Sequence, residues 1–189
     1  MSALELIANA AQRPLDAARA ALEGASADTL NEMPRGELNS MSWLVWHAAR
    51  QQDAQVAELR GAEQVWRSGG WCERFGLDRP CEDFGFGDDP QAVASVRVDG
   101  PGLLLGYLEA VTDTTAEYVR SLSDVELDEV IDDSWDPPVT RGVRIVSAID
   151  DAAPRHSTGA PPDPGGVRRA TGRPRQGSGA VASAAVDSP

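Results

Sequence analysis

The stretch 39–61 constrains the fold more than any other part of the chain, because it combines helix signals at both ends with an apolar interior around His47. Asn39 or Ser40 can cap the start of a helix, and Gly61 can end one. These signals predict one helix of about six turns. The apolar residues that recur along it at helical spacing are Met41, Val45, Ala48, Val56 and Leu59.

His47 is the candidate functional residue of this stretch. Residues 43–49 are apolar on almost every side of the predicted helix, so we expect little water around the imidazole. One interpretation is a core histidine whose ring bonds to a carbonyl or to another side chain. The other is a ligand for Zn, Ni or Fe, since neutral imidazole is a common protein ligand for these metals. The residues alone leave both interpretations open.

Three further stretches carry helical periodicity. Residues 3–23 predict an amphipathic helix that Pro14 kinks or splits, because proline removes a backbone donor and crowds the preceding turn. Residues 100–122 predict a third helix. Thr140 is expected to cap a fourth helix, which Pro154 cuts short. The expected apolar face of this last helix consists of Gly142, Ile145, Val146 and Ile149.

These stretches predict an all-α fold, an up-down-up-down four-helix bundle whose fourth helix is truncated. Residues 62–100 form a long crossover loop between the second and third helices, with a short helix starting at Asp89-Pro90. Residues 123–139 are acidic and are expected to run back to the other end of the bundle.

Five side chains in and after the 39–61 stretch each carry two interpretations. Trp66, Trp71 and Phe75 can anchor the crossover loop or close over the end of the bundle as a lid. Arg50 and Asp53 can orient a ligand of His47, but a solvated salt bridge is the expectation that we adopt.

A larger set of residues between positions 39 and 77 carries a family resemblance. These residues are Asn39, Ser40, Trp43–His47, Arg50, Asp53, Val65, Trp66, Gly70, Trp71 and Arg74–Leu77. Together they resemble the DinB superfamily, and within it the actinobacterial branch related to the metal-binding domain of mycothiol-dependent maleylpyruvate isomerase. The resemblance runs from about residue 3 to about residue 152.

The resemblance implies a metal site whose remaining ligands come from the last helix. That helix supplies a carboxylate and, four residues later, a histidine, which join the histidine of the second helix. Here Asp151 matches the acid and Arg155 takes the place of the histidine. His156 follows one residue too late, which is a turn of about 100° on a helix, and Pro154 prevents a regular helix there. The implied set His47, Asp151 and His156 is therefore a damaged site.

The function that the resemblance implies is transfer or isomerisation that depends on a divalent metal and a thiol. The metal is Zn or Ni, and the co-substrate is mycothiol, which relatives add to a small electrophile. A metal-bound thiol loses its proton and becomes a nucleophile at neutral pH. The alternative is a non-catalytic bundle, a structural or interaction protein whose uncovered apolar end forms a homodimer.

Residues 154–189 differ from the bundle domain, residues 1–153. They are mostly Ala, Pro, Gly, Ser, Thr and Arg, with no Phe, Trp, Tyr, Leu or Ile, and this composition predicts disorder. Loss of pattern after Ala152 raises the hypothesis of a shifted reading frame, with a genuine low-complexity tail as the alternative. The coding DNA around codon 152 decides between the two hypotheses.

Charge and composition exclude several partner classes. Residues 1–151 hold 12 Arg and 28 acidic residues, a net charge near −16, which disfavours nucleic acids and anionic membranes. With 41% apolar residues and no long apolar run, we expect a cytoplasmic protein with no membrane span. Cys72 and Cys81 match no usual zinc spacing, and we expect free thiols.

Overall fold

The computed structural model describes residues 1–152 and 173–174, and helices dominate this part of the chain, as the sequence predicts. The longest helices are α4 (Met41–Arg60), α8 (Pro101–Ser121) and α10 (Arg141–Ala152). The shorter elements are α1 (Ala3–Ala10), α2 (Arg13–Leu22), α3 (Ala27–Asn31), η1 (Pro34–Gly36), α5 (Val65–Ser68), α6 (Trp71–Phe75), α7 (Pro90–Ser95), α9 (Asp124–Leu127), β1 (Val130–Asp132), β2 (Trp135–Asp136), β3 (Val139–Thr140) and β4 (Arg173–Pro174).

Helix α4 begins and ends where the sequence predicts. The Ser40 hydroxyl accepts a hydrogen bond from the Trp43 backbone N–H at 3.2 Å, and this satisfies one of the free donors of the first turn. Gly61 ends the helix with φ of 59°, a left-handed conformation that glycine adopts without a Cβ clash.

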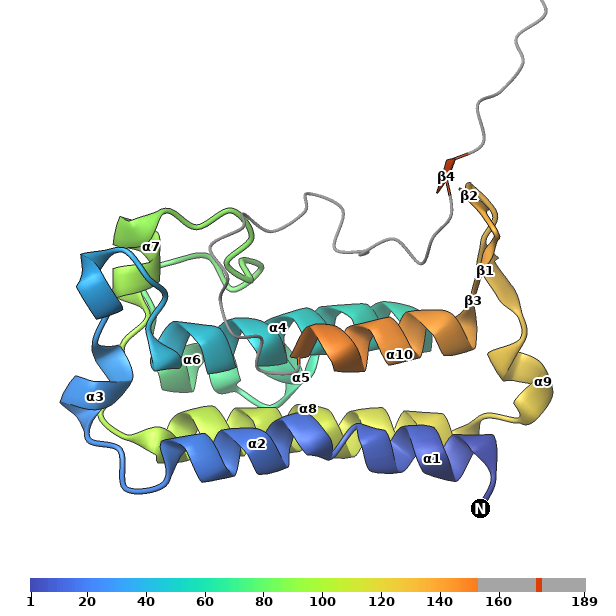
Figure 1. Cartoon of the computed structure of the whole chain (residues 1–189), viewed down its shortest axis with the longest axis horizontal. Helices are drawn as coiled ribbons and strands as arrows, with labels where there is room; N and C mark the ends of the chain where they lie inside the picture. Colours follow the sequence, from blue (N-terminus) through green and yellow to red (C-terminus); the bar gives the residue numbers. More distant parts are fainter. Residues whose placement is uncertain (153–172, 175–189) are drawn as a thin grey trace, which may run out of the picture.

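The first predicted helix is split in two. Pro14 lies in the first turn of α2, where a missing N–H costs no helical hydrogen bond. Helices α1 and α2 continue one another almost end to end along α8 (Figure 1). Together they form one kinked rod, the α1–α2 rod, that packs along α8.

Helices α4 and α8 run in the same direction. Gln52 donates a hydrogen bond to the Thr115 hydroxyl at 2.8 Å, and further along both helices the Tyr118 hydroxyl reaches the Leu59 carbonyl at 3.2 Å. Helix α10 begins beside the end of α4, where Arg141 donates to the same Leu59 carbonyl at 3.3 Å, and then runs back along α4 (Figure 1).

The α1–α2 rod runs opposite to α8, because Arg19 pairs with Glu109 at 2.6 Å while Glu5 lies 3.7 Å from Arg120. The predicted up-down-up-down order is therefore wrong for the second and third helices. A helix the length of α4 spans about 30 Å, and the crossover 62–100 is long enough to return the chain to the end where α4 begins.

The connection 123–139 also differs from its prediction. It stays at the end of the bundle where α8 finishes, and it folds into α9 and a short antiparallel pair of β1 with β3, in which Val130 faces Thr140. It does not run back, because α10 starts at that same end (Figure 1).

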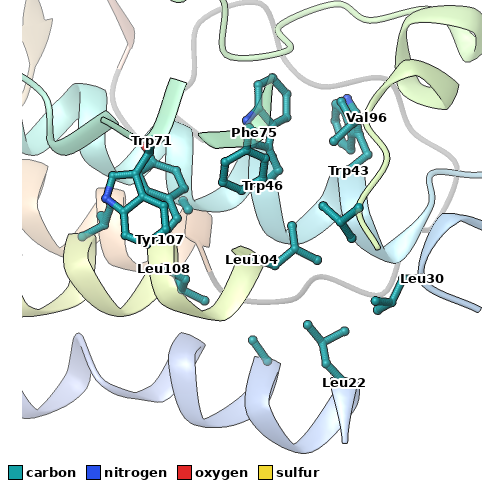
Figure 2. Packing of buried hydrophobic residues seen from close by; sticks show 14 of the residues in the cluster. Leu22, Leu30, Trp43, Trp46, Trp71, Phe75, Val96, Leu104, Tyr107 and Leu108 are labelled. Atoms are coloured by element: carbon teal, nitrogen blue, oxygen red, sulfur yellow. The ribbon is translucent and has the colours of Figure 1, made fainter. Parts of the chain in front are cut away.

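The larger hydrophobic core lies between α2, α4, α8 and the crossover, as Figure 2 shows. Trp66, Trp71 and Phe75 are 2%, 8% and 8% exposed, and their rings lie 5.0, 5.6 and 6.0 Å from that of Tyr107. The interpretation of these aromatics as anchors of the crossover is thus confirmed, and they do not form a lid.

The two cysteines are not free. Cys72 and Cys81 form a disulfide whose Cα atoms lie 5.8 Å apart. The prediction of free thiols was wrong because the spacing of the cysteines says nothing about the fold of the residues between them. The turn at Gly76, with φ of 57°, ends α6 and helps to reverse the chain between them.

Helix α10 has 12 residues, against 20 in α4 and 21 in α8. Ile145, Ala148 and Ile149 are buried, but Val146 is 50% exposed, so it does not belong to the apolar face as predicted. The predicted disorder and reading-frame shift of residues 154–189 lie outside the described residues, apart from β4. None of the helices within 1–152 is both long and apolar enough to cross a bilayer.

Candidate functional site

His47 lies on α4, one turn after Trp43, and is partly buried. Its ring stacks on that of Trp43 with centroids 4.3 Å apart and planes 17° apart. Its Nδ1 lies 2.5 Å from the Phe84 carbonyl oxygen. Because a carbonyl can only accept, the proton is on Nδ1, and Nε2 keeps its lone pair. The bond to a carbonyl is the one that the core interpretation predicts.

Burial lowers the pKa of His47 below its ordinary value. The hydrogen bond to Phe84 and the carboxylates of Asp88 and Asp83 act in the opposite direction, and Arg79 adds to the lowering. The imidazole is therefore neutral at pH 7. A neutral ring with an unprotonated Nε2 is the form that binds metals.

The turn at Gly85 packs closely against Trp46 and His47. Gly85 has φ of 82°, and a Cβ there would lie 2.8 Å from the Trp46 ring and 3.2 Å from His47 Nδ1. Its N–H donates to the Asp83 carboxylate at 2.8 Å. Only glycine lets the backbone come close enough for the Phe84 carbonyl to reach the imidazole.

Asp88 ties the same loop to α4. Its carboxylate accepts from Trp43 Nε1 at 2.7 Å and from Arg79 at 3.0 Å. The Arg79 guanidinium in turn lies over the Trp46 ring, 4.8 Å from its centroid. Sequence reasoning missed Arg79, Asp83, Phe84 and Asp88. The Gly-Phe-Gly run at 85–87 marks a turn, but nothing in the sequence says that the turn packs on His47.

Arg50 and Asp53 form a buried pair, so the expectation of a solvated salt bridge was wrong. They are 0% and 3% exposed and lie 3.7 Å apart. Asp53 accepts from the backbone N–H groups of Val65 and Trp66 at 2.8 and 2.7 Å and from the Tyr107 hydroxyl at 2.8 Å. The pair is buried because the crossover folds over this side of α4.

Arg50 also binds the crossover, through its own hydrogen bonds. It donates to the Gln64 side chain at 2.8 Å and to the carbonyls of Cys81 and Asp83 at 3.3 and 3.4 Å. Its guanidinium also lies 4.8 Å from the centroid of the Trp66 ring. All these partners are groups of the crossover, so Arg50 acts in holding the loop rather than in orienting a ligand of His47.

Asp151 lies on the last turn of α10 and is partly buried. It follows Arg141 by ten residues, and α10 runs back along α4 from the point where Arg141 contacts the Leu59 carbonyl. Asp151 therefore lies nearer the start of α4 than Arg141 does.

The predicted ligand set is not assembled by the described residues. His156 lies outside them. Within 1–152 and 173–174, no three His, Cys, Asp or Glu side chains gather closely enough to hold a metal ion. The donors in hand, His47 and Asp151, are of the right chemical type for Zn or Ni, but two protein ligands do not make up a three-ligand centre.

Comparison with known proteins decides the family. The family model of the DinB superfamily matches residues 10–150. The chain belongs to the DinB superfamily.

A solved structure is similar to this DinB chain over most of its length. The crystal structure of a conserved protein from Enterococcus faecalis shares 37% identity with a TM-score of 0.74, covering 80% of this chain and 89% of that one. A search of curated proteins finds no match. The likeness supports the helical DinB fold. The narrower resemblance to the actinobacterial isomerase branch stays a prediction.

Proposed function

We propose that this DinB chain is a metal-binding protein descended from transferases or isomerases that use a divalent metal and a thiol, and that its own metal site is impaired. Zn and Ni are the metals in question. The observation that carries the proposal is the state of His47, whose Nδ1–H is held by the Phe84 carbonyl. Histidines that bind metals commonly donate their other ring N–H in this way, which fixes the tautomer.

The position of α10 supports the same proposal. Helix α10 runs antiparallel along α4 and carries Asp151, the residue that matches the family's acid, on its last turn. The impairment follows from the sequence after it, because Arg155 occupies the family's histidine position and His156 is out of phase on a helix. The described residues do not complete a metal centre.

Mycothiol as co-substrate, with a small-molecule electrophile as its acceptor, extends the proposal from the family branch to this chain. A cytoplasmic location and the absence of nucleic-acid and membrane partners belong to the same proposal. The acidic body supports the last two points, since a net charge near −16 on residues 1–151 repels phosphate groups.

Metal titration of the purified full-length protein tests the proposal. We expect Zn²⁺ or Ni²⁺ to bind weakly, with a dissociation constant above about 1 μM, because two ligands hold an ion less well than three. His47→Asn keeps a donor for the Phe84 carbonyl and lacks the Nε2 atom, so binding should disappear while the fold remains. Asp151→Asn should weaken binding further than Asp150→Asn, its exposed neighbour on α10. Equal binding by wild type and His47→Asn overturns the proposal.

The second candidate function is a non-catalytic interaction protein. Val143 and Val146, one turn apart on α10, are 45% and 50% exposed. Exposed apolar residues of this kind favour association with a second copy. Light scattering during gel filtration measures it: a dimer that Val146→Asp converts to monomer supports this function, and a monomeric wild type excludes it.

A further inference from the structure

The Cys72–Cys81 disulfide lies within the crossover 62–100. Cys72 belongs to the first turn of α6, and Cys81 lies in a turn that the hydrogen bond from the Asp83 N–H to the Pro80 carbonyl closes at 3.0 Å. Both cysteines are partly exposed. The bond therefore closes a small surface loop and does not cross the hydrophobic core.

An open surface pocket of about 560 Å³ meets this disulfide on one side. Its lining residues are Glu63, Arg67, Glu73, Cys81 and Glu82. Cys81 lines the pocket and Cys72 does not. A nucleophile attacks a disulfide along the S–S axis, from the side opposite the leaving sulfur. A small thiol that enters this pocket therefore approaches Cys81, and Cys72 is the leaving group.

The charge of the pocket selects among thiols. Three carboxylates face one guanidinium, and that guanidinium of Arg67 is already paired with Glu82. The net charge of the lining is thus −2. Acidic thiols such as tripeptides with free carboxylates are repelled, whereas thiols that carry an ammonium group are attracted.

We propose that Cys81 is a site of thiol–disulfide exchange for small thiols that are neutral or cationic outside the sulfur. The incoming thiolate forms a bond to Cys81 Sγ while the Cys81–Cys72 bond breaks, and its electron pair leaves with Cys72 Sγ, which takes up a proton. A second thiol molecule then releases Cys81 by the same reaction, so two thiols are oxidised to their disulfide and the protein is reduced to the dithiol.

The crossover is built to survive this reaction. Arg50, which is fully buried, holds the carbonyls of Cys81 and Asp83 at 3.3 and 3.4 Å. These hydrogen bonds do not depend on the disulfide. The backbone at Cys81 and Asp83 therefore stays bound to α4 when the disulfide opens, and the two thiols remain close enough to form the disulfide again. In a reducing compartment, disulfides of intracellular proteins are typically transient and redox-active.

The test compares three small thiols on the intact oxidised protein: cysteamine, 2-mercaptoethanol and 2-mercaptoethanesulfonate. As thiolates they carry net charges of about 0, −1 and −2. For each thiol, the rate of disulfide loss is divided by the thiolate concentration and by the rate at which the same thiol reduces a small neutral disulfide. This ratio corrects for differences in intrinsic nucleophilicity among the thiols. We expect cysteamine to react about tenfold faster than the sulfonate at low ionic strength, with the ratio approaching one at about 0.5 M salt.

Two further arms locate the reaction. Trypsin separates Cys72 and Cys81 into different peptides, since Arg74 lies between them, and the mixed disulfide should be found on Cys81. The double variant Glu63→Gln, Glu73→Gln should raise the sulfonate rate, and Glu117→Gln on the exposed side of α8 should leave it unchanged. Adducts on Cys72, an absent charge order, or no reduction at millimolar thiol each overturn the proposal.

Discussion

At the scale of single residues, His47 shows how one side chain can be oriented by its neighbours before any ligand arrives. Stacking on Trp43 limits rotation of the ring, and the Phe84 carbonyl selects one tautomer. Burial then keeps the ring neutral. The Phe84 carbonyl and the Asp88 carboxylate, which accepts from Trp43, both come from the loop 83–88, so the loop is part of the candidate site.

The lowered pKa of His47 predicts a dependence of stability on pH. The unfolded chain takes up a proton at this residue near its ordinary pKa of about 6.5, before the folded chain does. The contribution is therefore present above that pH and is lost as pH falls through the lower folded pKa. Urea unfolding at about pH 7.5 and 5.5 should show a larger loss for wild type than for His47→Asn. An equal loss in both proteins contradicts the prediction.

Replacing Asp53 predicts a large loss of stability. Asp53→Ala leaves the Arg50 guanidinium buried without its counter-charge and frees two backbone N–H groups at the start of α5. We expect the free energy of unfolding to fall by about 3–5 kcal/mol, measured with urea. Glu58→Ala, an exposed acid on the same helix, should cost no more than about 0.5 kcal/mol. Similar losses in both variants would rule out a structural role for the pair.

Sequence reasoning identified His47 as the central residue but misjudged its neighbours. It treated Arg50 and Asp53 as exposed because charged residues usually are. Their burial depends on the crossover folding back over α4, and helical periodicity carries no information on such a return. The same reason explains the error on Cys72 and Cys81.

At the scale of secondary-structure elements, helices were predictable and their directions were not. The ends of α4 follow from Ser40 and Gly61, whose local signals need no tertiary context. The direction of α8 depends on the path of residues 62–100. A crossover of that length is itself a signal for parallel neighbours, since antiparallel helices need only short loops.

The turn at Gly85 provides a matched pair of substitutions. Gly85 and Gly87 have φ of 82° and 75°, but a Cβ meets the buried Trp46 ring only at position 85. Gly87→Ala should cost about 1–2 kcal/mol for the left-handed backbone alone. Gly85→Ala should cost a further 1–3 kcal/mol, on the order of overpacking a core, and should shift the His47 ring resonances in NMR. Equal costs would show that the loop does not press on His47.

At the scale of the whole molecule, the acidic body predicts a response to salt. Residues 1–151 carry a net charge near −16, and this self-repulsion opposes the compact state. Raising NaCl from about 10 mM to about 300 mM should increase the melting temperature, because the Debye length shrinks. Sucrose at equal osmolarity serves as a control for solvent effects without screening. A lower melting temperature in salt would mean that specific ion pairs outweigh the net repulsion.

The family was predictable from residues in and after α4, and the match to residues 10–150 confirms it. One of the implied metal ligands, His156, lies outside the residues that the structure describes. The metal and the thiol therefore stay predictions, and the helical fold is confirmed.

The same-direction pairing of α4 with α8 has a kinetic consequence. Arg50 and Tyr107, which touch across it, are 57 residues apart in sequence. Their contact requires closing a loop of that size, and the entropy lost in closing it comes before the stabilising contacts form. Contacts between residues so distant in sequence slow folding. During synthesis on the ribosome, α4 will wait for its neighbour until the whole crossover and α8 have emerged, with its apolar surface open to chaperones in the meantime.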